Sequence, residues 1–168
     1  MSEGEKASYD DVSVYELTPE RERELLEKQI EATFMWANKD GHPIGVIMNY
    51  LYHDGRIWLT ATKQRARIKA IQRDPRVSVT VSSMGTDMGA GKTITYKGTV
   101  RIHEDQATKD WFYPKMAKLL DGYPAPSEEA ALQMLDTPLR VILEIVPEMA
   151  IKFDGDRVAE MSRQAADQ

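Results

Sequence analysis

The feature that most constrains this chain is a series of short segments in which apolar and polar residues alternate. In "VSVTVS", for example, Val77, Val79 and Val81 share one face, and a period of two is the mark of a β-strand. Short turn signals such as "NKDG" (38–41) and "HDG" (53–55) separate these segments and indicate hairpins. Hairpin connections favour a mostly antiparallel sheet that can close into a small barrel.

The pattern predicts an α+β fold in which helices interrupt six strands. The predicted strands are 32–37, 43–52, 56–62, 77–82, 92–103 and 138–146. The predicted helices are 18–31, 63–73, 104–120 and 127–135, with a short polar helix at the end of the chain. The first helix begins at Thr18 because threonine caps helices well, and Pro19 and Glu20 suit the first turn.

The composition excludes several kinds of site. The 168 residues contain no cysteine, which removes disulfides and thiolate chemistry and fits a cytoplasmic protein. The histidines His42, His53 and His103 lie far apart in the sequence, so we expect no metal site. A net charge of −5 argues against a general nucleic-acid binder, and the longest uncharged run, 41–53, is too short to span a membrane.

The stretch "MGTDMGAGKTITYKG" (84–98) has the ending of a phosphate-binding loop but not its spacing. Counting back from Gly91, the first glycine of such a loop would be residue 86, which is Thr86. The loop must also run into a helix, whereas "TITYKGTVRI" continues as an alternating strand. We therefore interpret this stretch as a hairpin loop.

A better candidate for an anion site is the basic segment 63–76. It contains one acid, Asp74, and six cations: Lys63, Arg65, Arg67, Lys69, Arg73 and Arg76. The segment passes from a predicted strand into a predicted helix, where free backbone N–H groups favour an anion. The alternatives are a solvated basic helix face paired with the acidic first helix, and a nucleic-acid contact that lacks an aromatic platform.

The stretch "DGRIWLTATKQRARIKAIQRDPRVSVTV" (54–81) resembles the flavin-binding split barrels related to pyridoxamine 5′-phosphate oxidase. Within them it is most similar to the branch that uses the deazaflavin coenzyme F420. "YKGTVRI" (96–102) is similar to the following strand of that family, with Gly98 at its centre.

The resemblance implies a six-stranded split β-barrel that forms a homodimer, with a cofactor in each groove between the subunits. It divides the chain into an acidic lead and helix (1–31), a split-barrel cofactor-binding domain (32–153) and a polar C-terminal tail or helix (154–168). It also implies that Arg65 and Arg67 hold the cofactor phosphate. The implied cofactor-binding residues are Val46, Ile47, Met48, Asn49, Thr60, Ala61, Thr62, Gln64, Arg65, Arg67 and Lys69.

The activity that the resemblance implies is an oxidoreductase that uses reduced F420 to transfer hydride to an unsaturated or electron-poor small molecule. The alternatives are an FMN-dependent oxidoreductase of the same fold and a non-catalytic flavin- or haem-binding protein. We find no nucleophile–base pair and no carboxylate dyad, as expected where the cofactor carries the chemistry. The expected partners are a second copy of the chain and a small-molecule substrate, without nucleic acid or membrane.

Overall fold

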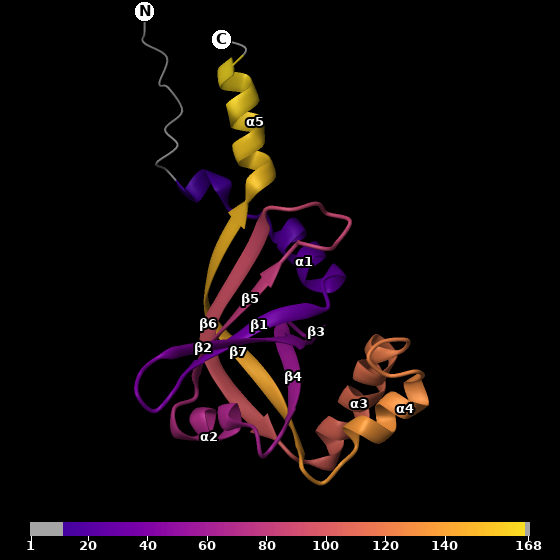
Figure 1. Cartoon of the computed structure of the whole chain (residues 1–168). Coiled ribbons are helices and arrows are strands. Elements are labelled where there is room, and N and C mark those ends of the chain that lie inside the picture. The colour runs from indigo at the N-terminus through magenta and orange to yellow at the C-terminus, as the bar shows by residue number, and fades with distance from the viewer. Residues whose placement is uncertain (1–11, 167–168) are drawn as a thin grey trace, which may run out of the picture.

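The computed structural model describes residues 12–166 and confirms the α+β class, with one curled antiparallel sheet surrounded by helices (Figure 1). The strands are β1 (Glu31–Ala37), β2 (Pro43–Asn49), β3 (Leu51–His53), β4 (Arg56–Thr62), β5 (Arg76–Ser82), β6 (Lys92–His103) and β7 (Arg140–Asp154). The helices are η1 (Val12–Tyr15), α1 (Pro19–Lys28), α2 (Ala66–Arg73), α3 (Gln106–Leu120), α4 (Glu128–Leu135) and α5 (Gly155–Ala166). The first 11 residues of the acidic lead lie outside the described residues.

The sheet curls because its two edge strands are neighbours in the chain. The strand order is β2-β1-β5-β6-β7-β4-β3, so β2 and β3 lie at opposite edges. Only Tyr50 separates them in sequence. Since consecutive Cα atoms are about 3.8 Å apart, the two edges must meet at this residue. The result is a curled half-barrel whose two edge strands, β2 and β3, are joined at Tyr50.

The prediction of six strands was wrong by one, because the segment 43–52 forms two strands rather than one. Tyr50 turns inwards, is 1% exposed, and donates its hydroxyl to the carbonyl oxygen of Leu26 at 2.9 Å. This contact with α1 breaks the strand, so that β2 pairs with β1 and β3 pairs with β4. The predicted strand 138–146 also continues further, to Asp154, as β7.

A bulge in the β6–β7 pairing at Lys97 and Gly98 lets the long last strand bend. Gly98 is required at this point because a Cβ atom there would overlap the carbonyl oxygen of Val146. The bend allows one strand to pair with β4 through its first half and with β6 along nearly all of its length.

Two apolar clusters hold the fold together. The first fills the curled sheet with strand residues such as Phe34, Leu59 and Val79. Helices α1 and α2 lie near opposite ends of the sheet (Figure 1), where Leu25 and Ile68 join this cluster. The second cluster lies outside the barrel, where α3 and α4 pack on Trp58 of β4 and Ile142 of β7. The α3–α4 pair is therefore a separate layer beside β4.

The glycine-rich loop connects β5 to β6 in a hairpin, and residues 92–103 form a strand as predicted. Lys92 is 1% exposed. Its Nζ donates to the Asp156 carboxylate at 2.8 Å and to the Ala90 carbonyl oxygen at 3.2 Å. The ammonium group of Lys92, the residue that makes this loop similar to a phosphate loop, is thus already bonded to protein groups.

Two further classes of feature are absent from residues 12–166. They contain no group of three or more histidine, aspartate or glutamate side chains placed to hold a metal ion. None of the helices in this part of the chain has the length and apolar character needed to cross a membrane.

Candidate functional site

The turn from β4 into α2 presents cationic side chains at the start of a helix. The N–H of Arg65 donates to the carbonyl oxygen of Thr62 at 3.1 Å and closes the turn. Arg65 is then the N-cap of α2, with an extended backbone (φ −67°, ψ 138°) and no capping bond from its side chain. The first turn of α2 contains no acidic residue, so its own side chains do not offset the positive end of the helix. Both features favour an anion.

Three of the six cations in the basic segment 63–76 already have protein partners. Lys63 and Arg76 form ion pairs with carboxylates at 2.5 and 2.6 Å, and Arg73 donates to a backbone carbonyl oxygen at 3.2 Å. The remaining three form no ion pair within the described residues, and they are Arg65, Arg67 and Lys69. The cations without an ion pair therefore include Arg65 and Arg67, which the resemblance assigns to the cofactor phosphate, and Lys69, which it implies as an assisting cation.

Arg140, at the start of β7, joins Arg67 in the same region. Across the sheet Arg140 pairs with Thr62, the last residue of β4. The Nε atoms of Arg67 and Arg140 are both buried and have no hydrogen-bond partner in the described part of the chain. Burial lowers the pKa of both guanidinium groups, and repulsion from Arg65 lowers each further. Three arginines thus gather here, and none of them forms an ion pair with a carboxylate among residues 12–166.

A pocket of about 240 Å³ opens at Arg67 and Arg140, and we call it the anion pocket. Its polar side chains are Asn49, Thr60, Arg67 and Arg140. Its apolar side chains come from β2, the two outer helices and the loop between them: Met48, Met116, Leu120, Pro124, Met134 and Leu135. The arginine end suits phosphate oxygens, and the apolar end suits an uncharged ring.

Four of the residues predicted from the sequence line the anion pocket together: Met48, Asn49, Thr60 and Arg67. The hydroxyl of Thr60 donates to the carbonyl oxygen of Val141 at 2.9 Å, so its hydrogen is already used within the sheet. Thr62 lies half-buried two residues further along β4, on the same face as Thr60. Arg65 acts on this pocket through its charge on Arg67 and Arg140.

The other predicted residues do not line the pocket. Ala61 is buried in the core on the opposite face of β4, so only its backbone could meet a ligand there. Val46 packs against the core, while Ile47 points to the other face of β2 and is 69% exposed. Gln64 and Lys69 are exposed at the turn and on α2.

Sequence reasoning missed Arg140 and the helical wall of the pocket. The strand that contains Arg140 was predicted, but its pairing with β4 was not, and only that pairing brings Arg140 to the end of "TAT" (60–62). Met116 and Met134 carried no signal, because a methionine on an apolar helix face is typical of any core. The one clue was an arginine directly before the buried run 141–145 of this strand.

Comparison with known proteins places the chain in one family. A family model described as pyridoxamine 5′-phosphate oxidase matches residues 13–152. No curated protein sequence matches the chain.

Several solved structures share the fold. A conserved hypothetical protein from Mycobacterium tuberculosis superposes with a TM-score of 0.73 at 20% identity, over 88% of this chain and 91% of that one. An FAD-binding protein from Mesorhizobium loti gives 0.61 at 21% identity, over 81% and 94%. A protein described as an F420 reductase gives 0.57 at 21% identity, over 77% and 94%. At sequence identities of 20–21%, this similarity shows a shared fold and nothing further.

Proposed function

The chain belongs to the pyridoxamine 5′-phosphate oxidase family, and from that premise we propose that it is an oxidoreductase that holds a flavin-type cofactor by its phosphate. The observation that carries the proposal is the group of three arginines, Arg65, Arg67 and Arg140, with two buried Nε atoms that lack partners among residues 12–166. A buried donor without an acceptor is costly. The planar fork of arginine matches phosphate oxygens, so a bound phosphate would satisfy both atoms.

The first candidate cofactor is the deazaflavin coenzyme F420, with an unsaturated or electron-poor small molecule as the substrate. Two findings support it: the similarity of the stretch 54–81 to the deazaflavin branch, and the shared fold with an F420 reductase. When bound, the cofactor would supply hydride transfer. The residues of the chain would position its phosphate and keep water from its ring, with Lys69 one helical turn from Arg65 as a further cation.

A second candidate is FMN. It is favoured because three cations of the basic segment 63–76 already bind protein groups. The tail of F420 carries carboxylates beyond the phosphate, and Lys63, Arg73 and Arg76 are the nearest further cations in the sequence. All three already have protein partners. FMN ends at its phosphate and needs none of them.

The ring of either cofactor would lie along the β2 stretch Val46–Asn49, at the end where Met48 and Asn49 enter the anion pocket. Backbone groups of Ala61 and the side chains of Thr60 and Thr62 would line the chain between ring and phosphate. Met48 offers a polarisable, adaptable contact to a flat ring.

We extend the proposal to a homodimer with the cofactor in a groove between subunits. Met149, Ile151 and Phe153 alternate along β7, share one face, and are 47%, 58% and 40% exposed. Ile151 stands in one cross-strand row that ends in exposed Ile47: Ile47, Thr33, Thr80, Thr95 and Ile151. An apolar face of this kind is typical of a protein interface. If a second subunit covered this face, Ile47 would lie in the cofactor groove between the two subunits.

The test is an anaerobic fluorescence titration of the cofactor-free protein with F420 and with FMN. We expect one of them to bind with a Kd of about 1 μM, and we expect Arg67→Ala or Arg140→Ala to weaken that binding by about 100-fold. Arg65→Ala should weaken it less, because that side chain is exposed to solvent.

Arg163→Ala is the matched control, since it removes the same charge from an exposed position on α5. The proposal fails if neither cofactor binds, or if the pocket variants bind as well as Arg163→Ala does.

A further inference from the structure

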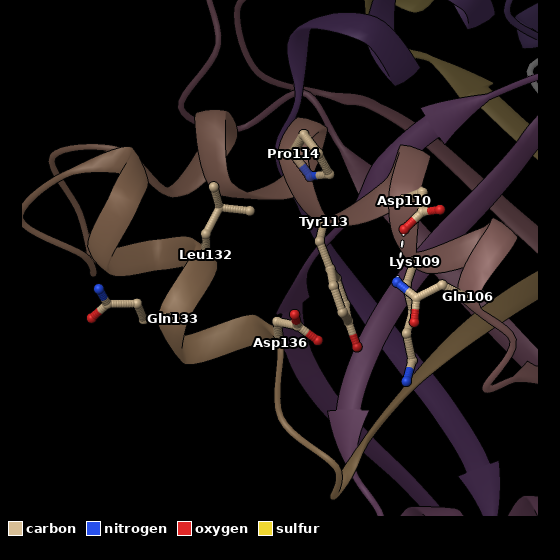
Figure 2. Close-up of a pocket in the computed structure, with 8 residues that line it drawn as sticks. All are labelled: Gln106, Lys109, Asp110, Tyr113, Pro114, Leu132, Gln133 and Asp136. Atoms are coloured by element: carbon tan, nitrogen blue, oxygen red, sulfur yellow. Dashed lines mark hydrogen bonds between the residues drawn. The ribbon is translucent and has the colours of Figure 1, made fainter.

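A second hollow, larger than the anion pocket, lies between α3 and α4 (Figure 2). Its volume is about 770 Å³, within the range of small-molecule sites. We call it the helical groove, and its lining residues are Gln106, Lys109, Asp110, Tyr113, Pro114, Leu132, Gln133 and Asp136. It shares no lining residue with the anion pocket, so its ligand is a separate question.

The helical groove contains a buried hydroxyl without a partner. Tyr113 is 3% exposed, and its hydroxyl forms no hydrogen bond with any described residue. Figure 2 shows its ring running from α3 towards the space between Asp136 and the pair Gln106 and Lys109. Burial raises the pKa of Tyr113, so at neutral pH the group is a hydrogen-bond donor. Buried hydroxyls in proteins are usually bonded, so this one is available to an acceptor on a ligand.

The helical groove also carries three charged side chains, which are one cation and two anions. Asp110 already accepts a hydrogen bond from Gln106 at 2.7 Å (Figure 2). Lys109 on α3 and Asp136 on α4 form no ion pair within residues 12–166. The α3 wall therefore presents a cation and a hydrogen-bonded carboxylate, and the α4 wall presents a second carboxylate on the other side of the Tyr113 ring (Figure 2).

We propose that the helical groove binds a zwitterionic, amino-acid-like molecule of about dipeptide size. Its carboxylate would lie at Lys109 and accept the Tyr113 hydroxyl, and its ammonium group would lie at Asp136. Its apolar side chain would pack on Leu132 and Pro114. A ligand with only one charge would leave the opposite wall unpaired, so the groove discriminates against both singly charged forms.

The helical groove shares no lining residue with the anion pocket, although Tyr113 and Arg140 are close enough to shift each other's pKa. Binding is therefore tested on the cofactor-free, full-length chain, where no cofactor phosphate at Arg140 alters the surroundings of Tyr113.

The experiment measures binding of three matched probes by calorimetry: the dipeptide alanyl-leucine, its N-acetyl form and its C-terminal amide. The acetyl form keeps only the carboxylate, and the amide keeps only the ammonium group. We expect the zwitterion to bind at least about tenfold more tightly than either derivative.

Two variants assign the two charges separately. Lys109→Gln should abolish the preference for the zwitterion over the amide, because the carboxylate then has no cation to meet. Asp136→Asn should abolish the preference over the acetyl form. Tyr113→Phe should lower affinity for the zwitterion by about tenfold through loss of one hydrogen bond. Lys118→Gln is the control, since this exposed α3 lysine does not line the groove.

Equal affinity of the three probes would overturn the proposal, as would no binding of the zwitterion at about 10 mM. So would variants at Lys109 and Asp136 that keep both preferences. If a flavin-type cofactor binds while the dipeptide does not, this proposal fails and the proposed function is untouched.

Discussion

Lys92 and Arg67 are two cations that the fold withdraws from solvent, and they have opposite surroundings. Lys92 donates to Asp156 at 2.8 Å, and Asp156 in turn pairs with Arg21 of α1 at 2.8 Å. The Nε of Arg67 is buried with no partner in the described chain, and the positive charge of Arg65 acts on the guanidinium group. The first cation is neutralised by the protein, and the second forms no ion pair with any described residue.

This difference reverses the impression given by the local motifs. Lys92 follows a glycine-rich stretch that ends like a phosphate loop, while Arg67 follows no known loop motif. A phosphate-binding cation must be free of protein carboxylates, because a paired one must first lose its partner. The pairing state of a cation is therefore a better guide to an anion site than the glycines beside it.

The largest effect is expected from removing the paired cation. Lys92→Met should lower the free energy of unfolding by about 2 kcal/mol, because it breaks a charged hydrogen bond that ties β6 to α5. The cost stays moderate since Asp156 is 58% exposed and remains solvated. Urea unfolding measures it, with exposed Lys97→Met on the same strand as control, where we expect a change below about 0.5 kcal/mol. Equal stability of the two variants would contradict a structural role for Lys92.

Stabilisation by a phosphate ligand should depend on Arg67 and not on Lys92. Pyrophosphate at about ten times its Kd should raise the free energy of unfolding by about 1.4 kcal/mol, because it binds only the folded chain. Arg67→Met should lose this stabilisation and Lys92→Met should keep it. Thermal unfolding at matched ionic strength in chloride supplies the control, and an equal rise in chloride would show a general salt effect instead.

Without a ligand, removing the unpaired cation Arg67 should not lower the free energy of unfolding. Arg67→Met should raise the free energy of unfolding by about 0.5 kcal/mol, because a partly desolvated charge repelled by Arg65 is replaced by an apolar side chain. Urea unfolding in phosphate-free buffer tests this, with Arg163→Met on α5 as the matched control. A loss of 1 kcal/mol or more, on the scale typical of structural residues, would mean that Arg67 has a protein partner after all.

The smallest effect concerns an exposed pair in the basic segment. The hydrogen bonds from Arg76 lower the pKa of Asp74 to about 2, against its ordinary 3.8. Because this pKa is depressed by folding, the pair stabilises above the unfolded pKa, and the contribution is lost as pH falls through about 2. In an NMR titration, Arg76→Ala should return the pKa of Asp74 towards 3.8, and Arg73→Ala should change it less. An unchanged pKa in Arg76→Ala would mean that Arg76 is free for a ligand.

Much of the fold could be predicted from the sequence because the signals are local. The strand 92–103 and the break between β4 and α2 follow from side-chain alternation and from where it stops. The segment 43–52 was misjudged, since its residues favour a strand throughout and only the bond from Tyr50 to Leu26 of α1 breaks it. Arg140 was missed for a similar reason, because its place depends on β7 pairing with β4.

By itself the sequence determined the strands, the helices and the concentration of cations in 63–76, because backbone periodicity and composition are properties of neighbouring residues. Only the tertiary structure decided which cations are free. The acids that neutralise Lys63 and Lys92 lie 41 and 64 residues away in the chain, and no local pattern records that distance. An ion pair forms where folding brings two charges within about 4 Å, so the anion pocket is defined by the carboxylates that the fold keeps away from it.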